Sequence, residues 1–262
     1  MSAGLPRPAA EVARLVAAAA ANLAGWHEAN LRALGYRNEH VDGLWLTPDR
    51  VPPIFFSAVA IRPGASAQAA VSRVPASGWV SISDPWGDLA LSTLGFSSDG
   101  DHPWMVRPPG ASGHPEELPP ELRIERVTEP EGLHDFELAA AAGFGSDPQP
   151  RFTWHAPPAL ADPRIAFWRG LVGGMTVAGS MSFVHAGVVG VYSVSTVPGA
   201  RRRGYASALT WVALTADPAL PSVLQPSPMA ESLYRRLGYE RFAAFRSWAR
   251  PGPYLPERSG HD

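Results

Sequence analysis

The sequence predicts a mixed α/β (α+β) protein, with a mixed β-sheet flanked by helices that is preceded by a smaller, diverged α/β lobe of similar element order. Three observations lead to this fold class. Helix-like and strand-like hydrophobic patterns alternate along the 262 residues. A proline-rich segment divides these patterns into two series, and short sequence matches relate one series to the other. Hydrophobic residues form 45% of the chain, which is enough to fill packed cores at this length.

The first series is expected to form a lobe over residues 1–106. Apolar residues recur at helical spacing from about Ala9 to Leu34, and Glu11 argues against a secretory signal, so an amphipathic helix is predicted there. The other predicted elements of this lobe are strands Val41–Thr47 and Ile54–Ile61, helix Ala65–Val74, strand Trp79–Ser83, a short helical piece and strand Pro103–Arg107.

Residues 107–120, with the sequence RPPGASGHPEELPP, are predicted to be a linker. This segment holds five prolines and two glycines in 14 residues, so it cannot supply the regular hydrogen-bond donors of a helix or a strand. A second domain is expected over residues 121–250, followed by a C-terminal tail over 251–262.

The second series contains more elements than the first. They are strand Leu122–Val127, helix Pro130–Ala142, a loop over 143–163, strands Arg164–Val172, Met175–His185 and Val188–Val197, helix Arg202–Ala216, strand Ser222–Gln225, helix Pro228–Leu237 and strand Glu240–Trp248. Between Arg169 and Arg201 lie 31 residues without a formal charge, more than the ~20 that cross a bilayer. Turn signals at 173–174 and 186–187 divide this stretch into strands, so no membrane span is expected.

Composition excludes several classes of function. All 22 basic residues are arginines, and with 24 acidic residues they give a net charge of −2, so neither a nucleic-acid partner nor a membrane partner is expected. The absence of cysteine excludes disulfides and thiolate nucleophiles. The eight histidines form no H-x-x-x-H or H-E-x-x-H pattern, so no metal site is expected. A cytoplasmic location is the default expectation.

An anion-binding turn is predicted where the third strand of the second series meets a helix. The chain there runs VSTVPGARRRGYA from Val194 to Ala206. Unsatisfied N–H groups and the dipole of a helix N-terminus favour a negative ligand, Gly204 allows close approach of the backbone, and Arg201–Arg203 add donors. These features together predict a phosphate-bearing ligand, whereas three arginines alone would favour a merely solvated basic turn. Neither the phosphate loop G-x-x-x-x-G-K-[ST] nor a G-x-G-x-x-G after a strand is present.

This R-x-x-G-x-A segment, with the segment Leu224–Tyr239 one helix and one strand later, resembles the GNAT superfamily of acyl-CoA-dependent N-acyltransferases. The resemblance covers about Leu122 to Arg250 and implies that residues 121–250 are the catalytic domain. It implies that the loop binds the pyrophosphate of acetyl-CoA and that the preceding strand end pairs with the pantetheine arm. The cofactor-binding residues implied in this way are Val194, Ser195, Thr196, Val197, Arg201, Arg202, Arg203, Gly204, Tyr205, Ala206 and Ser227.

The resemblance also implies a catalytic acid. Ser227 stands where the family usually has an asparagine, and the family's tyrosine seven residues later is present as Tyr234, which would protonate the departing thiolate of coenzyme A. Seven residues are about two helical turns, so both side chains could face one thioester. Ser227 could equally cap a helix beginning at Pro228. The spacing of Tyr234 also suits a packed core residue.

The acceptor side requires a base or a proton relay. An aliphatic amine of pKa ~10.4 must lose a proton to attack, which at pH 7 costs roughly 4 to 5 kcal/mol. Glu137, His155 and His185 are candidate bases that the sequence does not rank, and Glu137 and His185 join Tyr234 as the proposed catalytic residues. A strand-end N–H near Val194 could stabilise the oxyanion.

The expected function is therefore transfer of an acetyl group from acetyl-CoA to a primary amine, by direct attack in a ternary complex. The acceptor would be a small-molecule or peptide amine, and the protein a monomer or homodimer. One alternative is a regulatory module that binds acyl-CoA without transferring the acyl group, and another is a purely structural protein.

An internal duplication is a further hypothesis. Ile61–Ala65 reads IRPGA and Thr196–Ala200 reads TVPGA, and the triplets LGF and LGY lie at matching places near the end of each series. In the first lobe the matching loop has lost the glycine and the arginine run, and Leu91 stands in place of Tyr234. The first lobe is therefore expected to be a degenerate GNAT-like unit with a supporting role.

Overall fold

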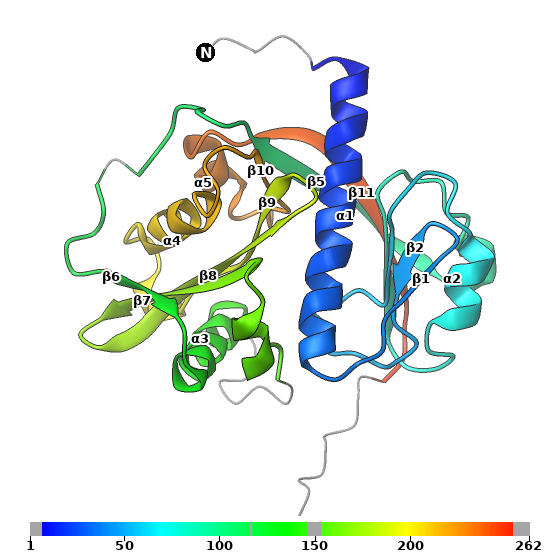
Figure 1. The fold of residues 1–262 in the computed structure, drawn as a ribbon, viewed down its shortest axis with the longest axis horizontal. Helices are drawn as coiled ribbons and strands as arrows, with labels where there is room; N and C mark the ends of the chain where they lie inside the picture. The colour runs from blue at the N-terminus through cyan, green and yellow to red at the C-terminus, as the bar shows by residue number, and fades with distance from the viewer. Residues whose placement is uncertain (1–6, 116, 146–152, 254–262) are drawn as a thin grey trace, which may run out of the picture.

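The computed structural model describes residues 7–115, 117–145 and 153–253, whose strands form an 11-stranded mixed sheet in the order β1-β2-β3-β4-β11-β5-β10-β9-β8-β7-β6 (Figure 1). The strands are β1 (Glu39–Val41), β2 (Leu44–Leu46), β3 (Ala58–Ala60), β4 (Val80–Asp84), β5 (Ser97–Arg107), β6 (Arg123–Val127), β7 (Ile165–Val172), β8 (Met175–His185), β9 (Val188–Thr196), β10 (Ser222–Leu224) and β11 (Glu240–Arg250). The helices are α1 (Ala9–Ala33), α2 (Ala67–Arg73), α3 (Pro130–Gly143), α4 (Tyr205–Leu214) and α5 (Glu231–Arg236), with short 3-10 turns η1 (Ser92–Leu94), η2 (Pro157–Ala161) and η3 (Pro198–Ala200). The predicted fold class, a mixed sheet flanked by helices, is confirmed.

Helices cover both faces of the sheet. Because strand side chains alternate between faces, neighbouring residues enter different cores: Trp45 packs with α1, whereas Leu44 and Leu46 pack with α2. In the second half α3 and α4 lie on either side of β7–β9 (Figure 1). The long helix α1 shares its core cluster with α3, so these two helices lie on the same face.

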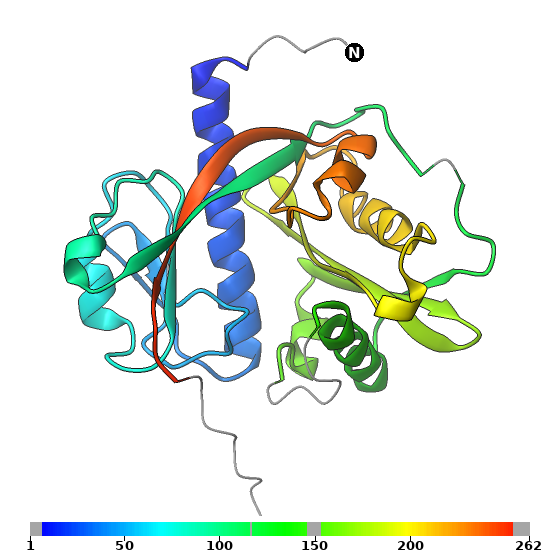
Figure 2. The ribbon, with the colours of Figure 1, turned by 180° about the vertical axis from the view of Figure 1, so that it is seen from behind.

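The two halves of the chain exchange their last strands. β5, from the first half, pairs antiparallel with β10 and β11, and β11, from the second half, pairs antiparallel with β4 and β5. Figure 2 shows β5 and β11 crossing the molecule side by side. One sheet therefore runs through both halves, and the domain division at 107–120 stays a prediction.

The helices and strands follow a similar order in both halves. The series α1-β1-β2-β3-α2-β4-η1-β5 matches α3-β7-β8-β9-α4-β10-α5-β11, and the second half has β6, η2 and η3 in addition. Each series contains one parallel pair, β3 with β4 and β9 with β10. This match supports the duplication hypothesis without testing descent.

Several predicted boundaries are wrong for local reasons. Val41–Thr47 is not one strand, because Asp42 (φ 47°) and Gly43 (φ 84°) form a turn that divides it into the hairpin β1–β2. Helix α4 begins at Tyr205 rather than Arg202, because Arg202 (φ 64°) and Gly204 (φ 83°) have left-handed backbones. Helix α5 begins only at Glu231, after a turn. Strand β5 begins at Ser97 rather than Pro103, and its first half is exposed and lacks an apolar signal.

The proline-rich segment after β5 forms no helix or strand in its described residues, as predicted, but it packs closely on the end of α5. Arg107 donates from Nε to the carbonyl oxygen of Leu237 at 2.8 Å. A Cβ on Gly238 would lie 2.2 Å from the carbonyl oxygen of Ser112, so the two backbones touch there. Among the described helices, none is both long enough and apolar enough to cross a bilayer.

Candidate active site

The neighbouring parallel strands β9 and β10 separate along their length. Their register pairs are Ser222 with Val189 and Val223 with Gly190, while β9 continues to Thr196. Beyond Gly190 the edge of β9 therefore has no partner in β10, which leaves backbone groups of β9 open to a ligand.

A β-bulge lies within this open stretch. On the other side of β9 the register with β8 pairs Tyr192 with Met181 and then Ser195 with Gly179. Ser193 and Val194 thus stand opposite one residue, which turns part of the backbone out of the ladder. Ser193 has φ 53°, a costly conformation for a residue other than glycine.

A cavity of about 860 Å³ opens beside this edge. It lies between the end of β9, the C-terminal end of α3, the N-terminus of α4 and the segment that leads into α5. Its lining residues are Gly143, Phe144, Gly145, Val194, Ser195, Thr196, Ala200, Arg201, Arg202, Gly204, Tyr205, Ala206, Ser207, Ser227, Met229, Ala230, Ser232, Leu233, Tyr234 and Arg236. Ten of the twelve residues predicted as cofactor ligands or as the acid are in this lining; Val197 and Arg203 are not.

The N-terminus of α4 presents free backbone donors to the cavity. Gly204 is its N-cap in a left-handed conformation, and no side chain caps the helix. Within the described residues, the first amides of α4, those of Tyr205, Ala206 and Ser207, have no hydrogen-bond acceptor. This end of the helix therefore favours an anion.

The three arginines of the turn differ in what they contact. Arg201 donates to two main-chain carbonyls, at 2.8 Å to Gly143 at the end of α3 and at 3.3 Å to Thr196 at the end of β9. Arg202 is exposed and lines the cavity. Arg203 lies beside Tyr205, whose hydroxyl donates to the Glu121 carboxylate at 2.6 Å. The Arg201 side chain is thus hydrogen-bonded to the main chain. Tyr205 lines the cavity, but its hydroxyl already donates to Glu121.

Tyr234 lies in the wall of the cavity and is only 6% exposed. Its ring packs against Tyr239 at 5.9 Å between centroids. Burial raises the pKa of Tyr234 to about 12, so the phenol is protonated at neutral pH. In the part of the chain that the structure describes, its hydroxyl has no hydrogen-bond partner.

Ser227 lines the cavity and is exposed. Its main-chain oxygen accepts from the amide of Ala230 at 3.0 Å, in the turn before α5. The proposed capping role is wrong, because α5 has Ala230 as its N-cap and no side-chain cap. Contact between Ser227 and a cofactor stays a prediction.

Glu137 does not lie in the cavity wall. Its Oε1 accepts the backbone N–H groups of Trp154 at 2.7 Å and His155 at 2.6 Å, so the carboxylate holds this loop against α3. Burial raises its pKa. The structure therefore gives Glu137 an evident structural role, and its role as a base stays a prediction.

The two candidate histidines are also outside the cavity lining. His155 is buried, with Nδ1 at 2.7 Å from Oδ1 of Asn30, and burial lowers its pKa to about 3. His185 is half-buried at the end of β8, and its pKa is lowered by burial and by the nearby charge of Arg164. The structure does not bring either histidine together with Tyr234 in one cavity.

One wall of the cavity is formed by residues that the sequence does not predict to be part of a site. Gly143, Phe144 and Gly145 end α3 against the open edge of β9, where a Cβ on Gly143 would lie 2.9 Å from Cβ of Ser195. A glycine at the end of a helix is an available signal for close backbone approach, but only the tertiary contact identifies the partner. Phe144 is 56% exposed, as an apolar part of this wall.

No group of three or more histidine and acidic side chains in the described ranges is arranged to hold a metal ion.

None of the known protein-family models matches this sequence. A comparison with the curated proteins also finds no match.

Solved structures of similar fold do exist. A GCN5-related N-acetyltransferase from Kribbella flavida is 20% identical with a TM-score of 0.62, over 88% of this chain and 96% of that one. A putative GNAT-family acetyltransferase from Novosphingobium aromaticivorans is 18% identical with a TM-score of 0.54, over 84% and 95%. A GCN5-related N-acetyltransferase from Sphaerobacter thermophilus is 17% identical with a TM-score of 0.52, over 95% and 96%. Over 84% to 95% of its length in these comparisons, the chain has the fold of the GCN5-related N-acetyltransferases.

Proposed function

We propose that the protein is an N-acetyltransferase that moves an acetyl group from acetyl-CoA to a primary amine by direct attack in a ternary complex. The observation that carries the proposal is the cavity itself. It joins the uncapped N-terminus of α4, the open edge of β9 and the side chain of Tyr234 in one continuous wall. These three features suit, in turn, a diphosphate, an amide-bearing arm and a thiolate leaving group.

The cofactor would be held mainly by the backbone. The free amides around Gly204, Tyr205 and Ala206 would bind the diphosphate, and Arg202 would add a charged donor. The amide groups of the pantetheine arm would pair with β9 from Val194 towards Val197, where no strand occupies the edge. Main-chain recognition of this kind is consistent with a sequence that has no lysine.

In the transfer step the amine nitrogen attacks the thioester carbon, forming a C–N bond as the C–S bond breaks. The phenol of Tyr234 gives its proton to the departing sulfur. The proton that the amine loses then reprotonates the Tyr234 phenolate. Burial keeps Tyr234 in its protonated form. The same apolar surroundings raise the pKa of a thiolate beside it, which favours the transfer.

The bulge of β9 would serve the oxyanion. A main-chain N–H at Ser193 or Val194 that is turned out of the ladder is fixed before the reaction, so it costs no reorganisation when the carbonyl oxygen becomes negative. For the base, Glu137 and His185 stay proposals. Each is tested by its isosteric variant, Glu137→Gln or His185→Asn.

The test is an assay of free thiol release from acetyl-CoA against a panel of small-molecule and peptide amines. The proposal expects amine-dependent thiol release together with an acetylated amine of matching amount. Tight binding of coenzyme A without turnover on any amine would instead favour a regulatory acyl-CoA module. Absence of binding would leave a structural role.

A further inference from the structure

Helix α1, from the first half of the chain, grips the β8–β9 hairpin that carries the bulge. Asn22, fully buried on α1, donates from Nδ2 to the carbonyl oxygens of Phe183 and His185, both at 3.0 Å, and of Val188 at 3.3 Å. Its Oδ1 accepts the hydroxyl of Tyr192 at 2.7 Å. One side chain thus binds both strands and the end of the hairpin.

Trp26 holds the same hairpin one helical turn later. Its indole stacks on the ring of Tyr192 with centroids 4.6 Å apart and planes 13° apart. Its Nε1 points to the sulfur of Met181 at 3.2 Å. Met181 and Tyr192 are the last register pair before the bulge, so α1 fixes both strands at the point where the register shifts.

Helix α1 and strand β9 pack so closely that Gly190 has no space for a side chain. A Cβ on Gly190 would lie 2.1 Å from Oδ1 of Asn22 and 2.5 Å from the ring of Tyr192. On the opposite face, Ser180, the residue that faces the bulge across the ladder, donates to the carbonyl oxygen of Leu209 in α4 at 2.8 Å. The bulge is therefore held from both faces of the sheet, and on one face by the half of the chain that lacks a cofactor loop.

We infer that Asn22, Trp26 and Tyr192 are positioning residues for acyl transfer, through which the first half of the chain sets the backbone of Ser193 and Val194. This inference rests on the proposed function for its catalytic consequence. It gives the first half a part in the reaction beyond supporting the sheet. None of the three residues lines the cavity, so their effect must pass through β9.

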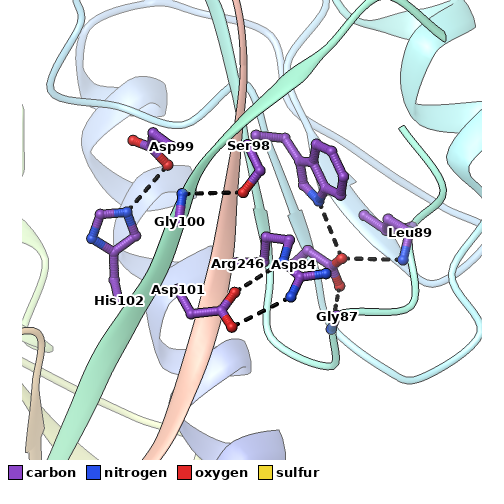
Figure 3. A network of polar contacts seen from close by, with 10 residues as sticks. Asp84, Gly87, Leu89, Ser98, Asp99, Gly100, Asp101, His102 and Arg246 are labelled. Atoms are coloured by element: carbon purple, nitrogen blue, oxygen red, sulfur yellow. Dashed lines mark hydrogen bonds and ion pairs between the residues drawn. The ribbon is translucent and has the colours of Figure 1, made fainter. Parts of the chain in front are cut away.

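The experiment compares three variants of the full-length protein. Tyr192→Phe removes the hydroxyl and keeps the stacked ring, and Trp26→Phe removes the indole N–H and part of the stack. Trp248→Phe is the matched control, because Trp248 is equally buried and its Nε1 also has one acceptor, Asp84 at 3.2 Å. Figure 3 shows Asp84 within its own polar network, where it also accepts the amides of Gly87 and Leu89.

Two readouts separate positioning from stability. With acetyl-CoA and an accepted amine, at a temperature where all variants are folded, kcat falls at least tenfold in Tyr192→Phe and Trp26→Phe, and the KM for acetyl-CoA stays within twofold. In Trp248→Phe, kcat stays within twofold of the wild-type value, even if its melting temperature falls as much as that of the other two variants. Hydrogen exchange at the amides of residues 193–195 becomes at least tenfold faster in the first two variants and is unchanged in the control.

The outcomes distinguish this inference from the proposed function. Equal kcat losses in all three variants, in proportion to their stability, would overturn the positioning role. So would unchanged exchange at 193–195 in Tyr192→Phe and Trp26→Phe. If the wild type transfers no acetyl group, the proposed function fails, and the exchange measurement alone still decides whether α1 sets the bulge.

Discussion

Tyr234 combines features that are unusual for a core tyrosine. A buried phenol normally finds a hydrogen-bond partner, as Tyr239 does with Ser222 at 2.6 Å. Tyr234 is also buried, yet its hydroxyl has no partner among the described residues, and the residue lines the cavity. Its hydroxyl is therefore free to donate to a ligand.

Replacement of Tyr234 by Phe should lower kcat about a hundredfold, the scale of a general acid, with little change in the KM for acetyl-CoA. Tyr239→Phe is the control, because it removes the hydroxyl of a neighbouring buried tyrosine outside the cavity lining. Steady-state kinetics of both variants check this. An unchanged kcat in Tyr234→Phe would remove that residue from the mechanism.

At the residue scale, a site is most readily predicted where a motif fixes the backbone. The turn 201–206, Ser227 and Tyr234 were predicted to share a site, and the structure places most of them around one cavity. The sequence does not rank the candidate bases, because the burial of a side chain and its hydrogen-bond partners depend on the tertiary structure. The carboxylate of Glu137 holds a loop 17 residues later in the sequence, which no local pattern reveals.

Among the elements, α3 and β9 are joined through Arg201. Its guanidinium contacts the carbonyls of Gly143 and Thr196 at once, so it ties the end of α3 to the end of β9. A planar guanidinium can bridge two carbonyls in a fixed geometry, whereas a lysine ammonium is a compact charge on a flexible stem.

Arg201→Lys should therefore raise the KM for acetyl-CoA severalfold although the charge is kept. Arg202→Lys should change it less, because Arg202, unlike Arg201, makes no hydrogen bond to the protein among the described residues, so its contribution is mainly charge. Kinetics at two salt concentrations test the pair. If Arg201→Lys behaves as the wild type, the side chain acts only by charge and the bridge to α3 is dispensable.

Element boundaries are predictable where turn residues or a long helical repeat mark them, and less so elsewhere. Strand β8 was predicted with its observed bounds, and α1 within one residue, because their patterns are long and regular. The hairpin β1–β2 was missed although Asp42 and Gly43 are a strong turn signal. The exposed half of β5 could not be found from hydrophobicity, since only pairing with β11 keeps it extended.

On the scale of the whole molecule, strand exchange makes the halves interdependent. β11 has β4 and β5 as its neighbours, and both come from the first half of the chain. The short sequence matches indicate two related units, but no pattern within either unit shows that its last strand pairs with strands of the other unit.

A fragment of residues 121–262 should consequently fail to fold, because β11 would lose both neighbouring strands and β10 would lose β5. Circular dichroism and a melting curve of the fragment beside the full chain check this. The opposite result is a fragment that melts cooperatively and whose aromatic residues give the same near-ultraviolet signal as they give in the full chain. That result would show that 121–250 is an independent domain.

Two buried histidines should make the whole molecule sensitive to acid. Burial lowers the pKa of His27 to about 4 and that of His155 to about 3. Below about pH 6.5 the unfolded chain binds protons that the folded chain cannot, so the free energy of unfolding falls with pH by about 1.4 kcal/mol per unit for each histidine. This loss continues until the pH reaches the folded pKa.

Urea titrations between pH 7 and 4.5 should show this slope, and His155→Gln should reduce it by about the contribution of one histidine. His134→Gln, at an exposed position, should leave it unchanged. If His155→Gln keeps the full slope, His155 is accessible to protons in the folded state.

The turn at Gly204 is the feature on which the proposed function depends. Its left-handed backbone directs the first amides of α4 to the cavity, and an added Cβ would meet no protein atom closer than 3.4 Å. Gly64 lies in the turn between β3 and α2, with φ 69° and open space around it, so it is a control of nearly equal backbone strain.

The most direct measurement is calorimetric titration of coenzyme A into the wild type and the variants Gly204→Ala and Gly64→Ala. Both variants should lose about 1 kcal/mol of stability from the left-handed backbone, but only Gly204→Ala should weaken coenzyme A binding, by about tenfold or more. Equal affinity in all three proteins, or no binding by the wild type, would contradict the account.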